Sequence, residues 1–245
     1  MLMNLIEKYK LSRLVNKYKR NGNTNEIKYL LSAIKEGQTV LDIGANVGLY
    51  VYYMQQRIGK NGSVHAFEPQ SALYTHLLKI KQLLQWNNTT IQPVALSDSS
   101  GFVTLHIPLF KGRPDTEGAS LLIHPEKSLY NTEKVATETI DNYCKQHNLA
   151  PGFLKIDVEG NELKVLQGGI ETIKKYKPKI LVEIEARHCG LEQAQATFTF
   201  FNDLEYEGWF FLKGERISLK LFRFDIHQDL KSKQQYCNNF IFEKK

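Results

Sequence analysis

From Gln38 onward, segments patterned as buried strands alternate with segments patterned as helices. Short apolar runs predict strands at 39–44, 62–69, 89–98, 152–160 and 177–186, and helical periodicity predicts helices at 47–59, before Trp86, at 161–176 and at 191–204. Two last runs, 208–214 and 238–244, predict final strands. Strands separated by helices indicate a doubly wound, mostly parallel α/β sheet with helices on both faces. Such a sheet binds its ligand at the carboxyl ends of the strands.

Residues 99–151 interrupt this alternation. The segments 101–108 and 134–140 are β-like and predict an added hairpin, which leaves a long loop over 109–134. Loops of this length inside a domain are usually functional or disordered. We expect the insertion to act as a lid or as a wall of the substrate site.

The chain of 245 residues is long enough for one large α/β domain with additions. No apolar run approaches the roughly 18 residues that span a bilayer. The first twenty residues carry charges too early and too often for a secretory signal. Three cysteines without CxxC spacing argue against a disulfide framework or a zinc site. We therefore expect a cytoplasmic protein without a transmembrane segment.

The positive charge is concentrated in the N-terminal segment. Residues 1–36 contain eight basic and three acidic residues, so they carry most of the net charge of +6. We expect residues 1–37 to form a basic helical segment, with a helix over 26–37 that ends at Gly37, and residues 38–245 to form the main α/β domain. The segment suits contact with a membrane surface, a polyanion or a second subunit, although a solvated helix packed across the edge of the domain is the favoured interpretation.

Apolar residues of this segment fall on two opposite helical faces. At about 100° per residue, one face holds the apolar residues that precede Leu11, and the other holds those from Leu11 to Tyr18. The pattern predicts a bend near Leu11, with Ser12 capping a second helix, or else a helix sandwiched between the domain and a partner. The apolar positions are Leu2, Leu5, Ile6 and Tyr9 on one face, and Leu11, Leu14, Val15 and Tyr18 on the other.

A glycine turn follows the first predicted strand. The sequence "VLDIGANVGLY" places Asp42 at the end of the strand and Gly44 and Gly48 in a turn that opens a helix. Glu68 ends the second strand, where a carboxylate can bind ribose hydroxyls. Together these residues indicate an adenosine-containing ligand. The alternative is a merely tight turn with a solvated Glu68.

The spacing of the glycines distinguishes between adenosine ligands. A dinucleotide fingerprint reads GxGxxG, whereas this turn reads GxxxG, with Asn46 in place of the middle glycine. That glycine makes room for a pyrophosphate, so its absence weakens the dinucleotide interpretation. S-adenosylmethionine has no phosphate, and its cationic groups suit a nearby carboxylate such as Asp42.

The segments "VLDIGANVGLYVYY", "VHAFEP", "VALSD", "FLKIDVEGNELKVLQGG" and "PKILVEIEARH" resemble the FkbM family of S-adenosylmethionine-dependent methyltransferases. The resemblance runs from about residue 38 to 188. It implies a class I methyltransferase fold, Rossmann-like, with a seven-stranded sheet whose last strand is antiparallel. It also implies methyl transfer, usually to a hydroxyl of a small molecule or sugar.

The resemblance also implies a set of donor-binding residues. Positions in the glycine turn would contact the methionine part, the end of the second strand would contact the ribose, and the end of the third would lie near the adenine. These residues are Asp42, Gly44, Ala45, Asn46 and Gly48 in and before the turn, Glu68 and Pro69 after the second strand, Leu96 and Ser97 after the third, and Asp157.

The strand 152–160 carries charged residues at alternating positions. Alternation places Lys155, Asp157 and Glu159 on one face. An alcohol is a poor nucleophile until its proton is removed, so Asp157 and Glu159 are candidates for the base or for orienting the donor. His188 is a third candidate because its pKa lies near neutrality. Lys155 is expected to pair with Glu183 or Glu185 of the next strand.

A metal is the alternative to a base. Asp42, Asp157 and Glu183 could surround a hard cation such as magnesium, although the same cluster could consist of structural ion pairs, and no metal ligands are assigned. The favoured function is O-methylation of a hydroxyl on a small molecule or glycan. An RNA methyltransferase that uses the basic N-terminus, and a binding protein without activity, are the alternatives; nucleic acid is not the expected partner.

Overall fold

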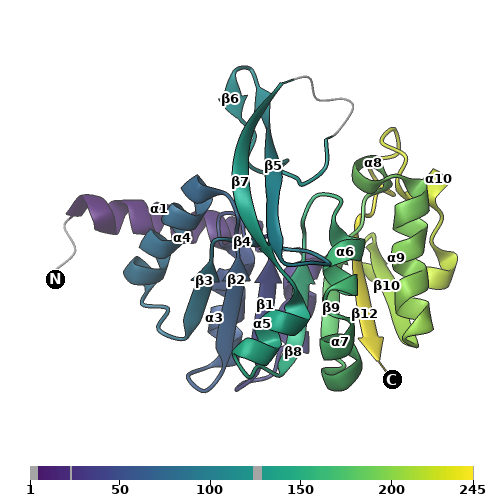
Figure 1. Cartoon of the computed structure of the whole chain (residues 1–245), viewed down its shortest axis with the longest axis horizontal. Helices are drawn as coiled ribbons and strands as arrows, with labels where there is room; N and C mark the ends of the chain where they lie inside the picture. The colour runs from purple at the N-terminus through teal and green to yellow at the C-terminus, as the bar shows by residue number, and fades with distance from the viewer. Residues whose placement is uncertain (1–4, 23, 124–128, 245) are drawn as a thin grey trace.

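A central sheet of eight strands organises the structure, which is a computed structural model describing residues 5–22, 24–123 and 129–244, with side chains described from Ser12 onward (Figure 1). The strand order is β11-β10-β12-β9-β8-β1-β2-β3. The bounds are β1 Thr39–Ile43, β2 Ser63–Phe67, β3 Thr89–Gln92, β8 Pro151–Ile156, β9 Lys179–Glu183, β10 Tyr206–Leu212, β11 Glu215–Ser218 and β12 Asn239–Lys244.

The direction of the strands confirms the predicted fold. Strands β3, β2, β1, β8 and β9 are parallel, and β12 enters antiparallel between β9 and β10. The prediction of seven strands is wrong by one, because β11 folds back onto β10. The two residues between them, Lys213 and Gly214, both have positive φ, 51° and 89°, as a tight hairpin turn requires.

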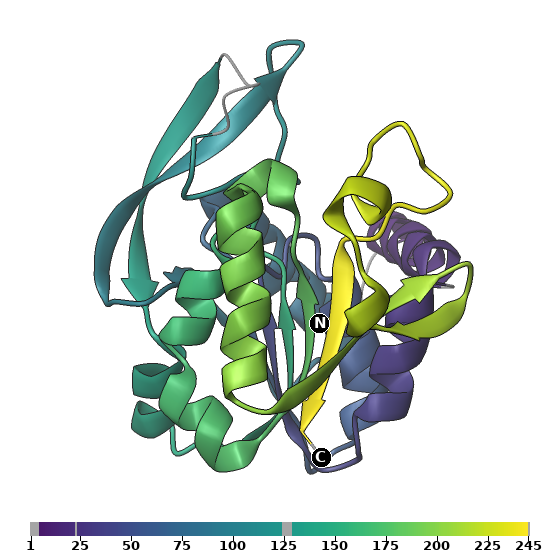
Figure 2. The same ribbon diagram turned by 90° about the vertical axis from the view of Figure 1, so that its right-hand side faces the viewer.

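Helices cover both faces of the sheet, as Figure 2 shows with the green helices on one side and the blue and purple ones on the other. Two separate apolar clusters lie between the sheet and these layers. The first layer contains α2 Asn25–Ala33, α3 Leu49–Ile58 and α4 Ser71–Leu84; the second contains α5 Ile140–Gln146, α6 Glu162–Gln167, α7 Ile170–Tyr176 and α9 Leu191–Asp203. Shorter helices are α8 Ala186–Cys189, α10 Phe224–His227 and the 3-10 turn Leu219–Leu221.

Two predicted helices have different bounds. The helix expected over 161–176 is split at Gly168 and Gly169, and position 168 requires a glycine because a Cβ there would lie 2.0 Å from the carbonyl oxygen of Ser97. The helix expected to end at Gly37 stops at Ala33, since Ile34 is already extended. Its N-terminus is capped by Thr24, which accepts from the backbone N–H of Ile27 at 3.3 Å.

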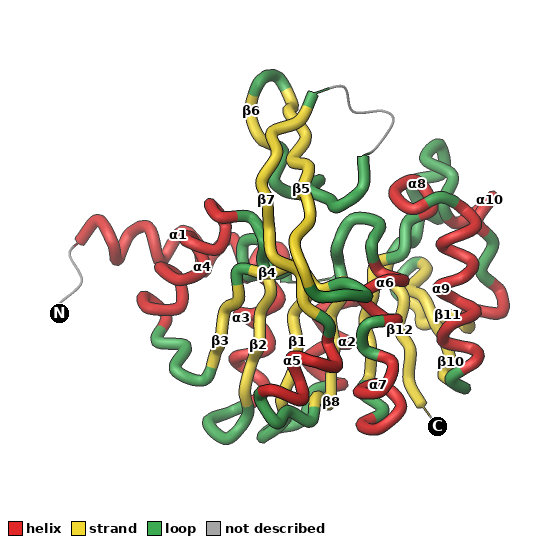
Figure 3. Tube along the Cα trace, in the orientation of Figure 1, coloured by secondary structure: helices red, strands yellow, loops and turns green. Residues whose placement is uncertain are grey.

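The insertion forms a second sheet that projects from the carboxyl edge of the main one (Figure 3). The predicted hairpin is confirmed, with β5 Gly101–Phe110 antiparallel to β7 Tyr130–Glu138. The strand predicted over 89–98 is broken at Pro93, which has no N–H to donate. Its second half, β4 Val94–Leu96, pairs with β7 instead.

The long loop is shorter than expected. Its ends belong to β5 and β7, and β6, Arg113–Pro114, pairs back onto β5. The segment 124–128, with His124, lies outside the described residues.

The N-terminal helix α1 runs unbroken over Leu5–Asn21, so the predicted bend at Leu11 and Ser12 is wrong. The predicted face of Leu2, Leu5, Ile6 and Tyr9, like the side chain of Leu11, lies outside the described side chains. Within the described residues, no helix combines the length and apolar character that crossing a membrane requires.

Candidate active site

A cavity of about 350 Å³ lies at the carboxyl ends of β1, β2 and β8, below the insertion. Most of the predicted donor-binding residues line it, and so does part of the loop that follows β6. The predicted residues on the wall are Gly44, Ala45, Asn46, Glu68, Pro69, Leu96, Asp157 and Glu159. Asp42, Gly48, Ser97 and His188 are not among the lining residues.

The glycine turn forms one wall, and its glycines are required for steric reasons. Gly44 has φ of 85°, and a Cβ there would lie 1.8 Å from the carbonyl oxygen of Asp157. Gly48 has φ of 83°, and its Cβ would meet Leu77 at 2.7 Å. The turn and the segment after β8 are therefore packed backbone against backbone, which leaves the remaining side of the turn open to a ligand.

Glu68 links the glycine turn to the segment after β2. Its two carboxylate oxygens accept hydrogen bonds from the backbone N–H groups of Asn46, at 2.8 Å, and Gln70, at 2.9 Å. Burial raises the pKa of the Glu68 carboxyl to about 7, although these two hydrogen bonds lower it. Glu68 is thus held in the wall by the backbone of both segments.

Two buried amide oxygens of the wall have no hydrogen-bond partner within the described structure. The side-chain NH₂ groups of Asn46 and Gln70 both donate to the carbonyl oxygen of Thr116, at 3.3 and 3.0 Å. Their oxygens, Asn46 Oδ1 and Gln70 Oε1, are left without donors. A buried acceptor without a partner is costly, so these two oxygens favour a ligand that brings hydroxyl or amino donors.

The sequence alone did not identify Gln70 and Thr116 as site residues. Gln70 could have been found from its place two residues after Glu68. Thr116 comes from the insertion, where no pattern indicated which residue reaches the cavity.

Asp42 lies beneath the glycine turn. It is almost completely buried at the end of β1, and it accepts a hydrogen bond from the backbone N–H of Val51 in the first turn of α3. Burial raises the pKa of its carboxyl to about 7, against the lowering effect of the Lys155 ammonium. Asp42 is opposite Lys155 in the register of β1 and β8. Its position therefore couples α3 to the sheet, and its contact with the donor stays a prediction.

Lys155 is fully buried and pairs within its own segment. Its Nζ lies 3.2 Å from Asp157 Oδ2 and 4.9 Å from the centre of the Tyr50 ring. The expected pairing with Glu183 or Glu185 is wrong, because the ammonium pairs with Asp157, which lies two residues further along the same face of its own segment. Asp157 itself keeps a partly exposed side chain on the cavity wall.

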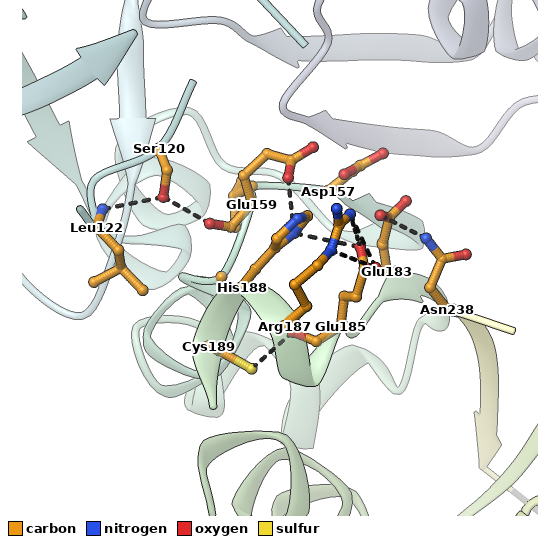
Figure 4. Close-up of polar contacts among 12 residues, drawn as sticks. Ser120, Leu122, Asp157, Glu159, Glu183, Glu185, Arg187, His188, Cys189 and Asn238 are labelled. Atoms are coloured by element: carbon orange, nitrogen blue, oxygen red, sulfur yellow. Dashed lines mark hydrogen bonds and ion pairs between the residues drawn. The ribbon is translucent and has the colours of Figure 1, made fainter. Parts of the chain in front are cut away.

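Glu159 and His188 form a close pair (Figure 4). Glu159 has a left-handed backbone, φ 55°, and its Oε2 lies 2.8 Å from His188 Nδ1. Glu185 Oε2 lies 3.5 Å from the same nitrogen, and Arg187 forms a two-pronged ion pair with Glu185. Burial lowers the pKa of His188, but the hydrogen bond and charge of Glu159 and the charge of Glu185 outweigh it, so the pKa is raised.

The loop after β8 is held from the insertion. Ser120 donates from its hydroxyl to the backbone carbonyl of Glu159 at 2.6 Å, and accepts from the N–H of Leu122 at 3.0 Å. This contact fixes the residue that presents its carboxylate to His188. The insertion is therefore part of the wall on both sides of the cavity, next to Gln70 and next to Glu159.

Three side chains of this region could hold a cation. Glu159, Glu183 and His188 each offer one ligand atom, and these atoms lie within 4.8 Å of one another. Glu183 also accepts from Asn238 Nδ2 at 2.8 Å, and burial together with the charge of Asp157 raises the pKa of its carboxyl well above its usual value. The set differs from the predicted Asp42, Asp157 and Glu183.

The strand order, the glycine turn and the carboxylate after β2 are those of the class I methyltransferase fold. The chain belongs to the FkbM methyltransferase family, since the model for the methyltransferase FkbM domain matches residues 42–226.

The chain is also similar in sequence to one characterised methyltransferase and shares its fold with solved structures. The chain is 25% identical over 179 residues to the hexuronic acid methyltransferase AglP of Haloferax volcanii. The matched residues make up 72% of this chain and 66% of that protein. It has a TM-score of 0.56 and 15% identity with an FkbM methyltransferase of Methylobacillus flagellatus, over 85% of this chain and 44% of that one. It has a TM-score of 0.50 and 12% identity with fibrillarin of Aeropyrum pernix, which was solved with bound S-adenosylmethionine. That match covers 86% of this chain and 68% of the fibrillarin chain.

Proposed function

We propose that the protein transfers the methyl group of S-adenosylmethionine to a hydroxyl of a sugar, with an acidic glycan unit as the favoured acceptor. The observation that carries the proposal is the Glu159–His188 pair at the edge of a cavity built for an adenosine ligand. The distant likeness to a hexuronic acid methyltransferase supports a sugar as the acceptor.

The donor fits the residues of the cavity. S-adenosylmethionine supplies an electrophilic methyl group on a sulfonium. Glu68 and the orphaned oxygens of Asn46 and Gln70 would accept hydrogen bonds from its ribose hydroxyls and amino group. The carboxylates of Asp157 and Glu159 suit the positive charges of the donor.

The Glu159–His188 pair would remove the proton of the acceptor hydroxyl. Glu159 lines the cavity, and His188 holds its carboxylate in place through the 2.8 Å contact. Because the two groups are hydrogen-bonded, they bind and release a proton as a unit. When the pair has lost its shared proton it can accept that of the hydroxyl while the oxygen attacks the methyl group. Holding both reactants in line supplies the larger part of the acceleration.

The acidic surroundings favour a hydroxyl over a carboxyl acceptor. After burial, the negative charge of Asp157 contributes to raising the pKa of Glu159 and of Glu183, so an acceptor carboxylate at the same place would be repelled. A sugar hydroxyl brings no charge and donates a hydrogen bond to these oxygens. The product would therefore be a methyl ether rather than a methyl ester.

Transfer of a deuterated methyl group tests this proposal. The protein is incubated with trideuteromethyl-labelled donor and, separately, with a glucuronic acid glycoside, a neutral glucoside and an RNA oligonucleotide, and the products are analysed by mass spectrometry. We expect label on a sugar, retained after mild alkali, which cleaves methyl esters and spares ethers. Label lost in alkali, or found only on RNA, would contradict the proposal.

A further inference from the structure

The last turn of α1 is fixed against the glycine turn. Lys17, Tyr18 and Asn21 line the cavity. Tyr18 is buried and donates from its hydroxyl to the carbonyl of Val47, while the hydroxyl of Tyr53 donates to the carbonyl of Tyr18 at 3.1 Å. The N-terminal helix is therefore a built part of the cavity wall, although it precedes the residues that match the family.

Lys17 is the one cationic side chain on this wall within the described part of the chain. The charged groups that otherwise line the cavity are the carboxylates of Glu68, Glu117, Asp157 and Glu159. Lys155 is nearby, but it is fully buried below the surface and paired with Asp157. Lys17 is exposed and has no ion-pair partner among the described residues.

The charges of the donor fit this distribution. S-adenosylmethionine carries two positive groups, the sulfonium and the ammonium, and one negative group, the carboxylate of its methionine part. The four wall carboxylates suit the first two, and the carboxylate needs a cation. Tyr18 contacts Val47, in the turn that the family resemblance assigns to the methionine part, so Lys17 stands at that end.

The start of α3 adds to the same end of the cavity. This helix of ten residues begins at Leu49 after Gly48, which has no side chain to cap it; Asp42 accepts from the N–H of Val51, and the positive end of the helix dipole also favours an anion beside Lys17. Val47, Leu49 and Tyr50 all line the cavity with Lys17.

We propose that Lys17 binds the carboxylate of the methionine part of the donor and that α1 thereby completes the donor site. This inference rests on S-adenosylmethionine being the donor. It gives the basic N-terminal segment a role in donor binding that does not require a membrane, a polyanion or a second subunit.

Calorimetry with two ligands tests the inference on the full-length protein. The first ligand is S-adenosylhomocysteine, and the second is S-adenosyl-3-thiopropylamine, which is the same molecule without the carboxylate. We expect Lys17→Met to weaken the first ligand by about five- to tenfold, as loss of a charge-assisted hydrogen bond implies, and to leave the second unchanged. Lys17→Arg should keep most of the affinity. Lys19→Met is the matched control, because Lys19 lies on the same helix but does not line the cavity.

Three results would overturn the inference. Unchanged binding of S-adenosylhomocysteine by Lys17→Met would show that Lys17 does not bind the donor, and it would leave the proposed methyltransferase function unaffected. An equal loss for both ligands would make Lys17 part of the wall rather than a partner of the carboxylate. Failure of the unmodified protein to bind either ligand would contradict the assignment of S-adenosylmethionine as the donor, and the inference would fail with it.

Discussion

His188 Nδ1 lies 2.8 Å from Glu159 Oε2, so a residue of the loop after β8 and a residue of the short helix α8 form a single ionisable unit at the edge of the cavity. The chain brings them together through the left-handed backbone of Glu159 and the tight helix that begins after Glu185. The pair is the group on which the proposed chemistry depends.

The pH dependence of turnover should follow this pair. Because the pKa of His188 is raised, kcat/KM should rise with pH through a midpoint above the ordinary imidazole value of about 6.5. Glu159→Gln removes the charge that raises the pKa, so the midpoint should move to lower pH while kcat falls about tenfold or more. Initial rates between pH 5 and 9, in steps of about half a unit, measure both. A midpoint that does not move in Glu159→Gln would contradict the assignment.

Donor affinity should depend on the ionisation of Glu68. The pKa of this carboxyl is raised to about 7, so in the free protein it takes up a proton as the pH falls through neutrality. A protonated Glu68 loses an acceptor for the ribose, and S-adenosylhomocysteine should bind more weakly below about pH 7. Glu68→Gln should lower the affinity about 10- to 100-fold and abolish the pH dependence.

Glu133→Gln is the matched control for Glu68. Glu133 Oε2 accepts from the backbone N–H of Ser71 at 3.0 Å, and Ser71 follows Glu68 by three residues. The side chain of Glu133 does not line the cavity. Fluorescence titrations at several pH values compare the three proteins. Equal affinity in Glu68→Gln and Glu133→Gln would contradict a role for Glu68 in binding.

Replacing Gly44 should damage the fold as well as the site. A Cβ at Gly44 would lie 1.8 Å from a backbone carbonyl that cannot move aside, and φ of 85° is itself unfavourable for alanine. Gly44→Ala should destabilise the protein by about 2–4 kcal/mol in urea unfolding. Gly112→Ala has similar backbone strain, φ 73°, but open space around it, so about 1 kcal/mol is expected there. Similar losses in the two variants would argue against the close packing.

The buried lysine should matter more for stability than for chemistry. Lys155→Met leaves Asp157 and Asp42 without their cation, and should cost about 3–5 kcal/mol in urea unfolding. The double variant Lys155→Met with Asp157→Asn removes both charges of the pair and should recover part of this loss. A single variant as stable as the unmodified protein would show that the pair contributes nothing.

Metal chelation should leave turnover unchanged. Glu159 and His188 could serve as ligands with Glu183, but in the structure they bind each other. We therefore expect full activity after treatment with EDTA and removal of the chelator. Loss of activity that magnesium or manganese restores would contradict the assignment of the pair as base and would place a cation among these residues.

The alternation of strands and helices was sufficient to predict the fold, because burial of a parallel sheet imposes that pattern on the sequence. The predicted and observed elements differ where local backbone geometry determines whether a strand or helix continues. Lys213 and Gly214 make a hairpin that adds β11, Pro93 separates β3 from β4, and a predicted helix is split at Gly168 and Gly169, where the backbone of Ser97 lies too close for a Cβ at Gly168.

Most of the cavity-lining residues at strand ends were among the predicted site residues, whereas those that long-range packing brings to the cavity were not. Glu68 and Asp157 follow strands, and a strand end fixes where a side chain can be. Thr116 and Lys17 reach the cavity through packing of the insertion and of α1, which no local pattern encodes. Gln70 was missed although it follows Glu68 by two residues. Glu159 and His188 were both candidates, but their contact depends on how the loop after β8 meets α8.

Binding of the demethylated donor is the measurement that tests the central claim most directly. Titration of the unmodified protein with S-adenosylhomocysteine in a calorimeter should give one site per chain, and Glu68→Gln should weaken it while Glu133→Gln does not. Absence of any binding by the folded, unmodified protein at millimolar ligand would contradict the assignment of the cavity as the donor site, and with it the proposed methyl transfer.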